Sequence, residues 1–348
     1  MTRTYDIAVY SADSLAGEAL IRQLEEGGEQ ALPVLNLYPL AEEAQASGTV
    51  DFHGQELELI SGESFEFTQV DFLFMPAGAV RHAGLMARAV EAGCVIIDGS
   101  RGASVQGDVL PVIPGGTEHQ MLADGTLEEA AHNRYLAYPG SPASLLLPLL
   151  RLVHHQYGLS RINLTLCQPV AGLGLKAVEA LRTQTIDLLN GKSVSSSGDE
   201  DNFSHRIAYN LLPASQGSNE EGLADVEKTI RDEVLMAVSP ELDVRVTCVT
   251  APVFFGDSFV VDLDTLQPVD LPDLSESMAC LPAVEVLVEG ETATVEDIAG
   301  SDRVALSRLR QSCVYGTGLS FWLVADSLRR GAVHGAELAR LLIKDFAR

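Results

Sequence analysis

The sequence predicts an α/β protein of two domains, a doubly wound domain of the nucleotide-binding type followed by an α+β domain. Short apolar runs alternate with helical patterns over the first third of the chain, which is typical of parallel βαβ units joined by right-handed crossovers. Longer runs of alternating apolar residues in the second half suit antiparallel strands with one packed face. The length of 348 residues suggests two domains, and 46% hydrophobic residues are enough to fill two cores.

The first domain is expected over residues 1–134. Its predicted elements are the strand Asp6–Ser11, the helix Leu15–Glu26, the strands Val34–Tyr38 and Asp71–Gly78, the helix Ala83–Gly93 and the strand Cys94–Ser100. Near the end of the chain, leucines at 328, 338, 341 and 342 recur near helical spacing. We therefore expect residues 326–348 to return as a helix that completes this domain.

The second domain is expected over residues 135–325. Helices are predicted at Ala143–Tyr157, Leu175–Asn190 and Asp225–Ala237, and alternating strand patterns at Arg161–Val170, Asp243–Leu263 and Ala283–Gly290. The polar segment Ser193–Asn202 can bury nothing and is predicted to be a surface loop.

The charge of the chain excludes two classes of partner. With 23 Lys and Arg against 49 Asp and Glu, the formal net charge is −26. Nucleic acids and anionic membranes both require clustered cationic side chains, so we expect small-molecule or protein partners instead. No apolar run approaches the roughly 20 residues that cross a bilayer, and the N-terminus lacks the features of a signal peptide, so a cytoplasmic protein is expected.

The cysteines and histidines give no sign of a disulfide framework or a metal site. The five cysteines are an odd number, widely spaced and mostly in apolar runs, so reduced core thiols are predicted at Cys94, Cys167, Cys248, Cys280 and Cys313. The adjacent pair His154 and His155 would point to different helix faces and could not chelate a metal together. Neither a GxxxxGK[ST] loop nor a GxSxG elbow occurs, which argues against phosphoryl transfer and the common hydrolase arrangement.

Eight collinear segments carry a resemblance to a known family: LAGEAL, CVIIDGS, AYPGSPASLLLPL, RINLTLCQPVAGLGLKAVEAL, TQTIDLLNGK, RIAYNLLP, VTCVTAPVFFGDS and FWLVADSLRRGA. Together they resemble aspartate-semialdehyde dehydrogenase, a family of the glyceraldehyde-phosphate dehydrogenase-like superfamily. The resemblance implies a Rossmann-like domain that binds NADP, a catalytic and dimerisation domain with a mixed sheet, a homodimer, and a role in amino-acid biosynthesis.

The positions of the family's nucleophile and acid–base group hold other residues here. The family's catalytic Cys matches Ser141, and its acid–base His matches Asp257. A thiol is partly ionised near neutrality, whereas a serine hydroxyl needs an adjacent base before it can attack. The structural alternatives are that Ser141 caps a helix that starts at Pro142, and that Asp257 is a turn residue after Gly256.

The two arginines by which the family binds the substrate carboxylate and phosphate are also replaced. Their positions match Thr250 and Ser104, while Arg101 is displaced by three residues and is expected to be an exposed loop residue. The family's substrate-orienting Gln is retained as Gln168. Its neighbour Cys167 is expected to be a core residue, not a replacement nucleophile.

The cofactor loop departs from the family's Gly-x-x-Gly-x-x-Gly pattern. The matching stretch includes Ser11, Asp13, Ser14, Leu15 and Gly17, and it keeps only the last glycine, which helix–strand packing explains. Serine side chains occupy positions meant for bare backbone, and Asp13 opposes a diphosphate. We expect NADP and NAD to bind weakly or not at all, although the two serines could still donate hydrogen bonds.

Two hypotheses about function follow. The first is a divergent paralogue, resembling family members that lack the active-site Cys, with lost or much reduced dehydrogenase activity and a binding or regulatory role. The alternative is an active NADP-dependent semialdehyde dehydrogenase, acting on aspartate 4-semialdehyde or aspartyl phosphate with a rearranged site. The joint loss of cooperating groups favours the first, because losing any one of them already removes most of the catalysis.

Overall fold

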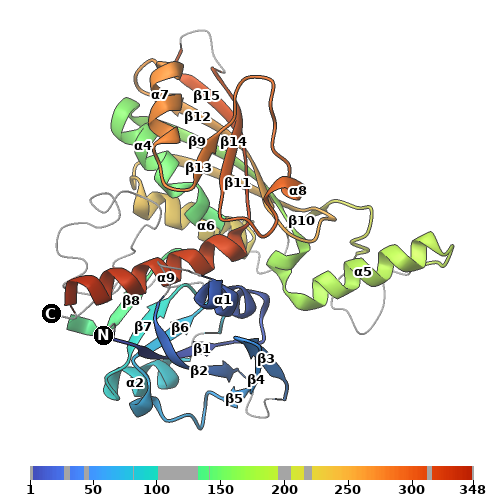
Figure 1. Ribbon diagram of the computed structural model, residues 1–348. Coiled ribbons are helices and arrows are strands. Elements are labelled where there is room, and N and C mark those ends of the chain that lie inside the picture. Colours follow the sequence, from blue (N-terminus) through green and yellow to red (C-terminus); the bar gives the residue numbers. More distant parts are fainter. Residues whose placement is uncertain are drawn as a thin grey trace. The chain divides into compact units, whose positions relative to one another are not determined.

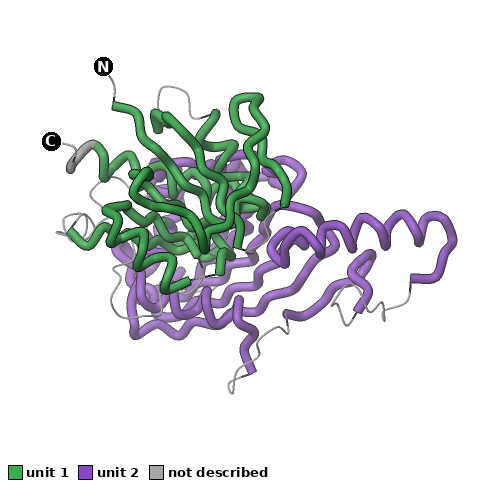
Figure 2. The backbone as a smooth tube through the Cα atoms, turned by 90° about the horizontal axis from the view of Figure 1, so that it is seen from below, with its two compact units in different colours: residues 1–148, 327–348 green, residues 149–326 purple. Residues whose placement is uncertain are grey.

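The chain divides into two compact units (Figure 2), and each is built on one large sheet. Unit 1 comprises Met1–Pro148 and Ser327–Arg348, and unit 2 comprises Leu149–Asp326. The computed structural model describes residues 3–26, 32–42, 47–80, 82–100, 132–140, 142–194, 205–214, 222–311 and 316–346. Most of the predicted surface loop Ser193–Asn202 lies outside these residues.

Unit 1 is built on a six-stranded sheet of order β5-β2-β1-β6-β7-β8, in which every neighbouring pair is parallel. Its strands are β1 (Tyr5–Tyr10), β2 (Val34–Ala41), β5 (Ile60–Ser61), β6 (Phe72–Met75), β7 (Val95–Asp98) and β8 (Tyr135–Ala137). The strand order runs outward from β1 to both sides, so the predicted doubly wound, Rossmann-like architecture is confirmed.

Helices cover both faces of this sheet, which explains why its strands are almost continuously apolar (Figure 1). Helices α1 (Leu15–Glu26) and α9 (Ser327–Phe346) pack against each other, and their apolar side chains join one core cluster. Helix α2 (Ala83–Glu91) contributes to a second cluster. Beyond β2 lie a hairpin of β3 (Thr49–Phe52) and β4 (Gln55–Glu58) and the 3-10 helix η2 (Phe67–Gln69).

The boundary of unit 1 differs from the one predicted after residue 134. Strand β8 pairs with β7, and the 3-10 helix η3 (Pro142–Leu145) contacts α9, so both elements belong to unit 1, which extends to Pro148. The predicted helix Ala143–Tyr157 is two elements, η3 and α4 (Leu147–Tyr157). Pro148 lies in the first turn of α4, where a proline is tolerated and where a new helix can start.

Unit 2 is built on a seven-stranded mixed sheet of order β10-β11-β9-β12-β15-β14-β13. Its strands are β9 (Leu159–Gln168), β10 (Leu212–Pro213), β11 (Asp243–Thr250), β12 (Asp257–Thr265), β13 (Val284–Val286), β14 (Val304–Gln311) and β15 (Gly318–Ala325). Its helices are η4 (Val170–Leu173), α5 (Leu175–Leu189), α6 (Asp225–Ala237), α7 (Leu271–Ala279) and α8 (Val295–Ile298).

The antiparallel direction predicted for the alternating runs is confirmed for β12 and holds only in part for β11. Strand β12 is antiparallel to β9 and β15, whereas β11 is antiparallel to β10 but parallel to β9. The connection from β9 to β11 contains α5 and α6, and a crossover of that length lets the next strand return in the same direction.

Strands β11 and β12, which lie on either side of β9, have one packed face, as the alternating runs predicted. On that face Phe259, Val261 and Leu263 of β12 are buried within the single chain, and α6 packs on β11. The opposite face carries Asp243, Arg245 and Thr247 in exposed positions. The alternation of apolar residues in β11 and β12 therefore reflects packing of one sheet face within the same chain.

The cysteines only partly match the expectation of core thiols. Cys94 and Cys248 are buried and Cys167 is half-buried, but Cys280 is exposed where α7 ends. The C-terminal position of a short helix can carry an apolar residue without burying it. Cys313 lies outside the described residues. Among the residues that the structure describes, no helix is long and apolar enough to cross a membrane.

The close approach of α1 to the end of β1 generates a stability prediction. A Cβ on Gly17 would lie 2.2 Å from the backbone oxygen of Ser11 and 2.8 Å from the Cα of Ala12. Neither backbone atom can move without displacing the strand. We expect Gly17→Ala to lower the free energy of unfolding by about 2–3 kcal/mol, in the range of overpacked cores.

The matched control is Gly84→Ala in α2, because a Cβ on Gly84 would meet no atom within 4 Å. That variant should keep or slightly raise stability, as alanine favours a helix over glycine by roughly 0.5–1 kcal/mol. Urea unfolding monitored by circular dichroism measures both variants. Equal stability of the two would contradict the packing argument.

Candidate functional site

Three of the residues predicted for the site lie on neighbouring strands at one end of the unit 2 sheet. Gln168 ends β9 and pairs with Thr250, which ends the parallel strand β11. Asp257 begins β12, where Ser258 pairs with Cys167, so Asp257 lies level with Gln168. The exposed fractions of Gln168, Thr250 and Asp257 are 2%, 5% and 1%. The structure therefore brings these three side chains together on the buried face of the sheet.

Asp257 is not the turn residue that we considered as its structural alternative. It is the first residue of β12, pairs with Ala325 of β15 and is buried. A second carboxyl group lies nearby, because Asp326 is the residue after Ala325, the partner of Asp257. Asp326 accepts a hydrogen bond from the backbone N–H of Gly300 at 2.9 Å. Sequence reasoning missed Asp326, since only the register of β12 against β15 places it here.

The side-chain amide of Gln168 is held by its surroundings. Its Oε1 accepts a hydrogen bond from the Sγ of Cys248 at 3.6 Å. On the other side, a Cβ on Gly172 would lie 2.4 Å from Nε2, so the backbone of η4 closes against the amide. Two backbone hydrogen bonds, from Val170 and Ala171 to the segment after β11, fix η4 in place. The amide is thus oriented by the protein itself.

A buried carboxylate that the sequence did not point to supports the same region. Glu227, in the first turn of α6, accepts hydrogen bonds from the backbone N–H of Ala224 at 2.9 Å and of Cys248 at 2.8 Å. A carboxylate there also favours the positive end of the helix. The only sequence signal was an acidic residue at the third position of a predicted helix, which is typical of capping. Glu227 therefore fixes Cys248, and through it Gln168.

Cys167 does not offer a replacement nucleophile. It follows the alternation of β9 onto the face opposite to Gln168 and is half-buried, so it is not the fully buried core residue that we expected. Burial raises the pKa of the Cys167 thiol above its ordinary value, which keeps it protonated near neutral pH.

The remaining residues of the predicted substrate site cannot be placed. Ser141, Ser104 and Arg101 lie outside the described residues. The described residues next to Ser141 are tightly packed: the hydroxyl of Tyr138 donates to the backbone oxygen of Gly331 at 3.2 Å, and a Cβ on Gly140 would lie 1.6 Å from the backbone oxygen of Gly99. Pro142 begins η3, as the helix-start signature predicted.

The cofactor loop between β1 and α1 satisfies its own hydrogen-bonding groups. The hydroxyl of Ser14 donates to the backbone oxygen of Ser11 at 2.7 Å and accepts from the backbone N–H of Gly17 at 3.0 Å, so Ser14 caps α1. Ser11 has a φ of 52°, a conformation more usual for glycine, and its hydroxyl donates to Glu42. In this conformation both serine hydroxyls donate to acceptors of the protein itself.

The loop therefore fits an anionic diphosphate poorly. The N–H of Gly17 is already used, and Asp13 is exposed beside the helix start. Leu15 is half-buried as the first residue of α1. Gly17 is explained by its contact with β1, as predicted. A diphosphate would have to displace the Ser14 cap and approach a carboxylate, both of which oppose binding.

Glu42 is a residue of this loop region that sequence reasoning missed. It directly follows β2, and its Oε1 accepts hydrogen bonds from the hydroxyl of Ser11 and from the backbone N–H of Val80 at 2.9 Å. The carboxylate thus joins the ends of β1 and β2 to the segment after β6. A sequence signal was present, because in doubly wound domains an acidic residue after the second strand meets the ribose of a dinucleotide.

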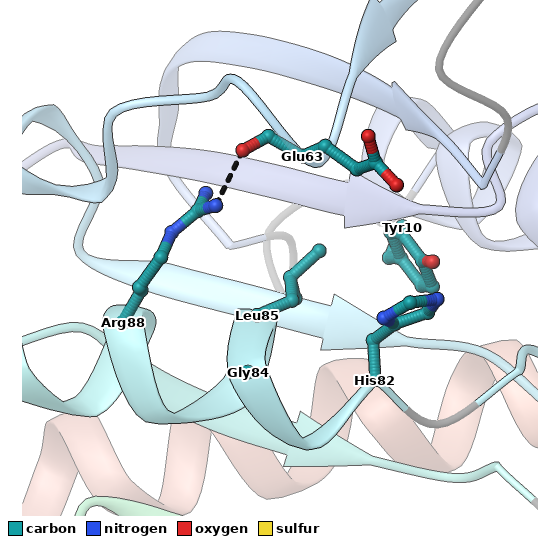
Figure 3. A pocket seen from close by; sticks show the side chains of 6 residues that line it. All are labelled: Tyr10, Glu63, His82, Gly84, Leu85 and Arg88. Atoms are coloured by element: carbon teal, nitrogen blue, oxygen red, sulfur yellow. Dashed lines mark hydrogen bonds between the residues drawn. The ribbon is translucent and has the colours of Figure 1, made fainter.

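A cavity of about 230 Å³ opens beside this region in unit 1 (Figure 3). It is lined by Tyr10, Glu63, His82, Gly84, Leu85 and Arg88. The guanidinium of Arg88 is committed to the backbone oxygens of Gly62, Glu63 and Phe65. Burial, followed by the carboxylates of Glu42 and Glu63, raises the pKa of Tyr10 above its ordinary value. The cavity lining therefore combines apolar with ionisable side chains.

No cluster of three or more His, Cys, Asp or Glu side chains that could hold a metal ion occurs among the described residues.

Comparisons with known proteins address both units. The chain matches the family model "Semialdehyde dehydrogenase, NAD binding domain" over residues 6–122 and the model "Semialdehyde dehydrogenase, dimerisation domain" over residues 149–330. The aspartate-semialdehyde dehydrogenase of Legionella pneumophila is 30% identical over 352 residues, which cover 99% of this chain and 98% of that protein. A USG-1 protein homolog of Pseudomonas aeruginosa is 31% identical over 349 residues, covering 99% and 100%.

A solved structure agrees with these matches. Aspartate semialdehyde dehydrogenase II from Vibrio cholerae has a TM-score of 0.87 at 27% identity, covering 99% of this chain and 100% of that one. Because both units match models of the family and relatives align over their full length, the chain belongs to the aspartate-semialdehyde dehydrogenase family.

Proposed function

We propose that this protein is a divergent paralogue within its family, with lost or much reduced dehydrogenase activity, which acts in the cytoplasm by binding a metabolite or a protein. The observation that carries the proposal is the pair Thr250 and Asp257, buried beside Gln168 where the family resemblance implies an arginine and a histidine. The resemblance also matches Ser141 to the catalytic Cys and Ser104 to the second arginine.

The chemistry of the replaced groups supports this proposal. A substrate that carries a carboxylate and a phosphate needs cations, and Thr250 supplies only a hydroxyl. A carboxyl group at 257 cannot serve as an imidazole, which donates and accepts a proton near neutral pH. Gln168 is the family residue that is retained, and its Oε1 already accepts a hydrogen bond from the Sγ of Cys248. At the described positions 250 and 257 the site thus has neither the arginine nor the imidazole that the resemblance implies, while Gln168 is kept.

The alternative remains an active NADP-dependent semialdehyde dehydrogenase of amino-acid biosynthesis. It is favoured by the names of full-length relatives such as the Legionella pneumophila enzyme. It would require a nucleophile and an acid–base group from other residues. The described thiols beside Gln168, Cys167 on β9 and Cys248 on β11, do not suit the role of nucleophile. Cys248 is buried and donates to Gln168, and the pKa of Cys167 is raised by burial.

We further propose a homodimer formed through the open face of the unit 2 sheet. Across four neighbouring strands of that face, Thr247, Thr165, Val260 and Trp322 form one cross-strand row. Val260 is 37% exposed and Trp322 is half-buried, so the row is partly apolar. A twofold contact would pair this row with its own copy. The match to a dimerisation domain over residues 149–330 supports this assignment.

The first prediction is catalytic. Purified protein should give no phosphate-dependent reduction of NADP⁺ with aspartate semialdehyde above a no-enzyme control, because Ser141 replaces the thiolate. Absorbance at the nicotinamide band measures it. Turnover that Ser141→Ala abolishes would establish the active alternative.

A second prediction asks whether one replacement restores activity. Ser141→Cys alone should stay inactive, since the new thiol has no imidazole at 257 and no guanidinium at 250 or 104 to hold the substrate. The quadruple variant with Cys at 141, His at 257 and Arg at 250 and 104 is the smallest change that rebuilds these groups, and any turnover should first appear with it, at a rate limited by weak cofactor binding at the unchanged β1–α1 loop. Because positions 250 and 257 are buried, the unfolding midpoint of each variant must be measured alongside. Substantial turnover by the single variant would refute the proposal.

A third prediction concerns assembly. The wild-type protein should sediment as a dimer of 37.2 kDa chains at micromolar concentration. Val260→Arg should shift it to the monomer, because a twofold axis brings the two new charges together and desolvates them. The control is Leu266→Arg, a 72% exposed position after β12. A monomeric wild type, or equal effects of the two substitutions, would reject this interface.

A further inference from the structure

The cavity of unit 1 lies on the α2 side of the sheet. Tyr10 and Leu85, which form its apolar part, belong to the core cluster of α2, whereas α1 packs in the other cluster. The cavity of about 230 Å³ is smaller than the pockets of about 300 to 1,000 Å³ that hold drug-sized ligands. Its size therefore suits a small metabolite, and its lining includes no residue of the loop between β1 and α1.

Arg88 holds two walls of the cavity together. From α2 its guanidinium donates to the backbone oxygens of Gly62, Glu63 and Phe65. A Cβ on Gly62 would lie 3.0 Å from the ring of Tyr10, so the same loop is also packed directly on the floor of the cavity. The cavity is thus formed before a ligand enters, which lowers the ordering cost of binding.

The hydroxyl of Tyr10 is a donor that the protein leaves unused. Tyr10 is only 1% exposed, and its hydroxyl makes no hydrogen bond to any residue that the structure describes. Its raised pKa keeps this hydroxyl protonated near neutral pH. Buried hydroxyl groups are normally hydrogen-bonded, so one that lines a cavity without a partner points to an acceptor on a ligand.

The first turn of α2 supplies further donors. His82 is the N-cap residue, but its side chain makes no capping hydrogen bond. Gly84 lines the cavity through its backbone, and a Cβ there would meet no atom within 4 Å. The N–H groups of a first turn have no acceptor within the helix and attract anions. Arg81 directly precedes His82 but lies outside the described residues, so no contact is assigned to it.

A carboxylate lies close to these donors. Figure 3 shows the carboxylate of Glu63 and the ring of His82 at the Tyr10 end of the cavity, with the apolar side chain of Leu85 beside them. An acceptor for a cation and donors for an anion are therefore gathered at one end. An α-amino acid has the matching form, because its ammonium and carboxylate are attached to the same carbon and its side chain leads away from both.

We propose that this cavity binds a free α-amino acid with an apolar side chain. The ammonium faces the carboxylate of Glu63, the carboxylate accepts from the hydroxyl of Tyr10 and the first N–H groups of α2, and the side chain packs on Leu85. The inference names one class of metabolite for this protein. It concerns a site separate from the replaced residues of unit 2, so neither outcome of the turnover assay decides it.

The test is isothermal titration calorimetry of the full-length protein with L-leucine. Leucine should bind with a dissociation constant of about 1 mM or lower, as expected for so small a ligand. Two analogues separate its charged ends, since isocaproate lacks the ammonium and isoamylamine lacks the carboxylate. Each should bind at least about tenfold more weakly than L-leucine, because one end of the site is left without its partner.

Three variants change one wall each. Glu63→Gln should weaken L-leucine binding by at least about tenfold, and Tyr10→Phe by about fivefold. Gly84→Leu should abolish binding, because the added side chain occupies the open space beside Gly84. The matched controls are Glu66→Gln, an exposed position after the same loop, and Ala87→Leu, an exposed position of α2. Neither control residue lines the cavity, so both variants should bind L-leucine as wild type does.

Unfolding midpoints verify that each variant is folded. The proposal is overturned if L-leucine does not bind, if either analogue binds as tightly as L-leucine, or if the lining variants and their controls weaken binding equally.

Discussion

The approach of α1 to the end of β1 is the contact on which the rest of unit 1 depends. Gly17 lets the helix start directly against the backbone oxygen of Ser11, and α1 then packs on α9, whose side chains share the same core cluster. The turn is sealed by the hydroxyls of Ser14 and Ser11. In nucleotide-binding relatives of this architecture, bare glycines would leave those N–H groups to a phosphate. Here the serine hydroxyls that stabilise the turn already use hydrogen-bonding groups of the loop, including the N–H of Gly17, that would otherwise face a phosphate.

The sequence predicts the local elements well because their signals are local. The bounds of α1 and α6 agree with the periodicity and the capping residues of their segments. The direction of β11 and the β3–β4 hairpin depend on pairing between distant segments, which periodicity does not report. The same limit applies to the β12 run: alternation shows that one face of the strand is packed, but it does not show whether a helix of the same chain or a second subunit packs on that face.

The positions of the candidate site could be predicted from the sequence, but the burial and the hydrogen-bond partners of its residues could not. Matching motifs identified Gln168, Thr250 and Asp257, and the parallel and antiparallel registers bring them to one end of the sheet. Burial of Asp257 in a strand, where the Gly-Asp-Ser sequence suggested a turn, comes from pairing with β15 and has no local signature. Glu227 and Asp326 were missed for the same reason, because each accepts a hydrogen bond from a residue far away in sequence, whereas Glu42 was missed although its place after the second strand was a signal.

The discontinuous make-up of unit 1 has a consequence for biosynthesis. Its core cluster includes Ala332, Leu338 and Leu342 of α9, and the Tyr138 hydroxyl donates to Gly331 of the same helix. A ribosome makes these residues after all of unit 2, so the first unit to begin translation cannot be the first to be completed. Unit 2 is contiguous in the chain, and its last strand, β15, emerges before α9. Translation therefore completes unit 2 before unit 1, the reverse of the usual order for an N-terminal domain, and the apolar residues of β1, β6 and α1 that share a cluster with α9 lack this cover until α9 has been made.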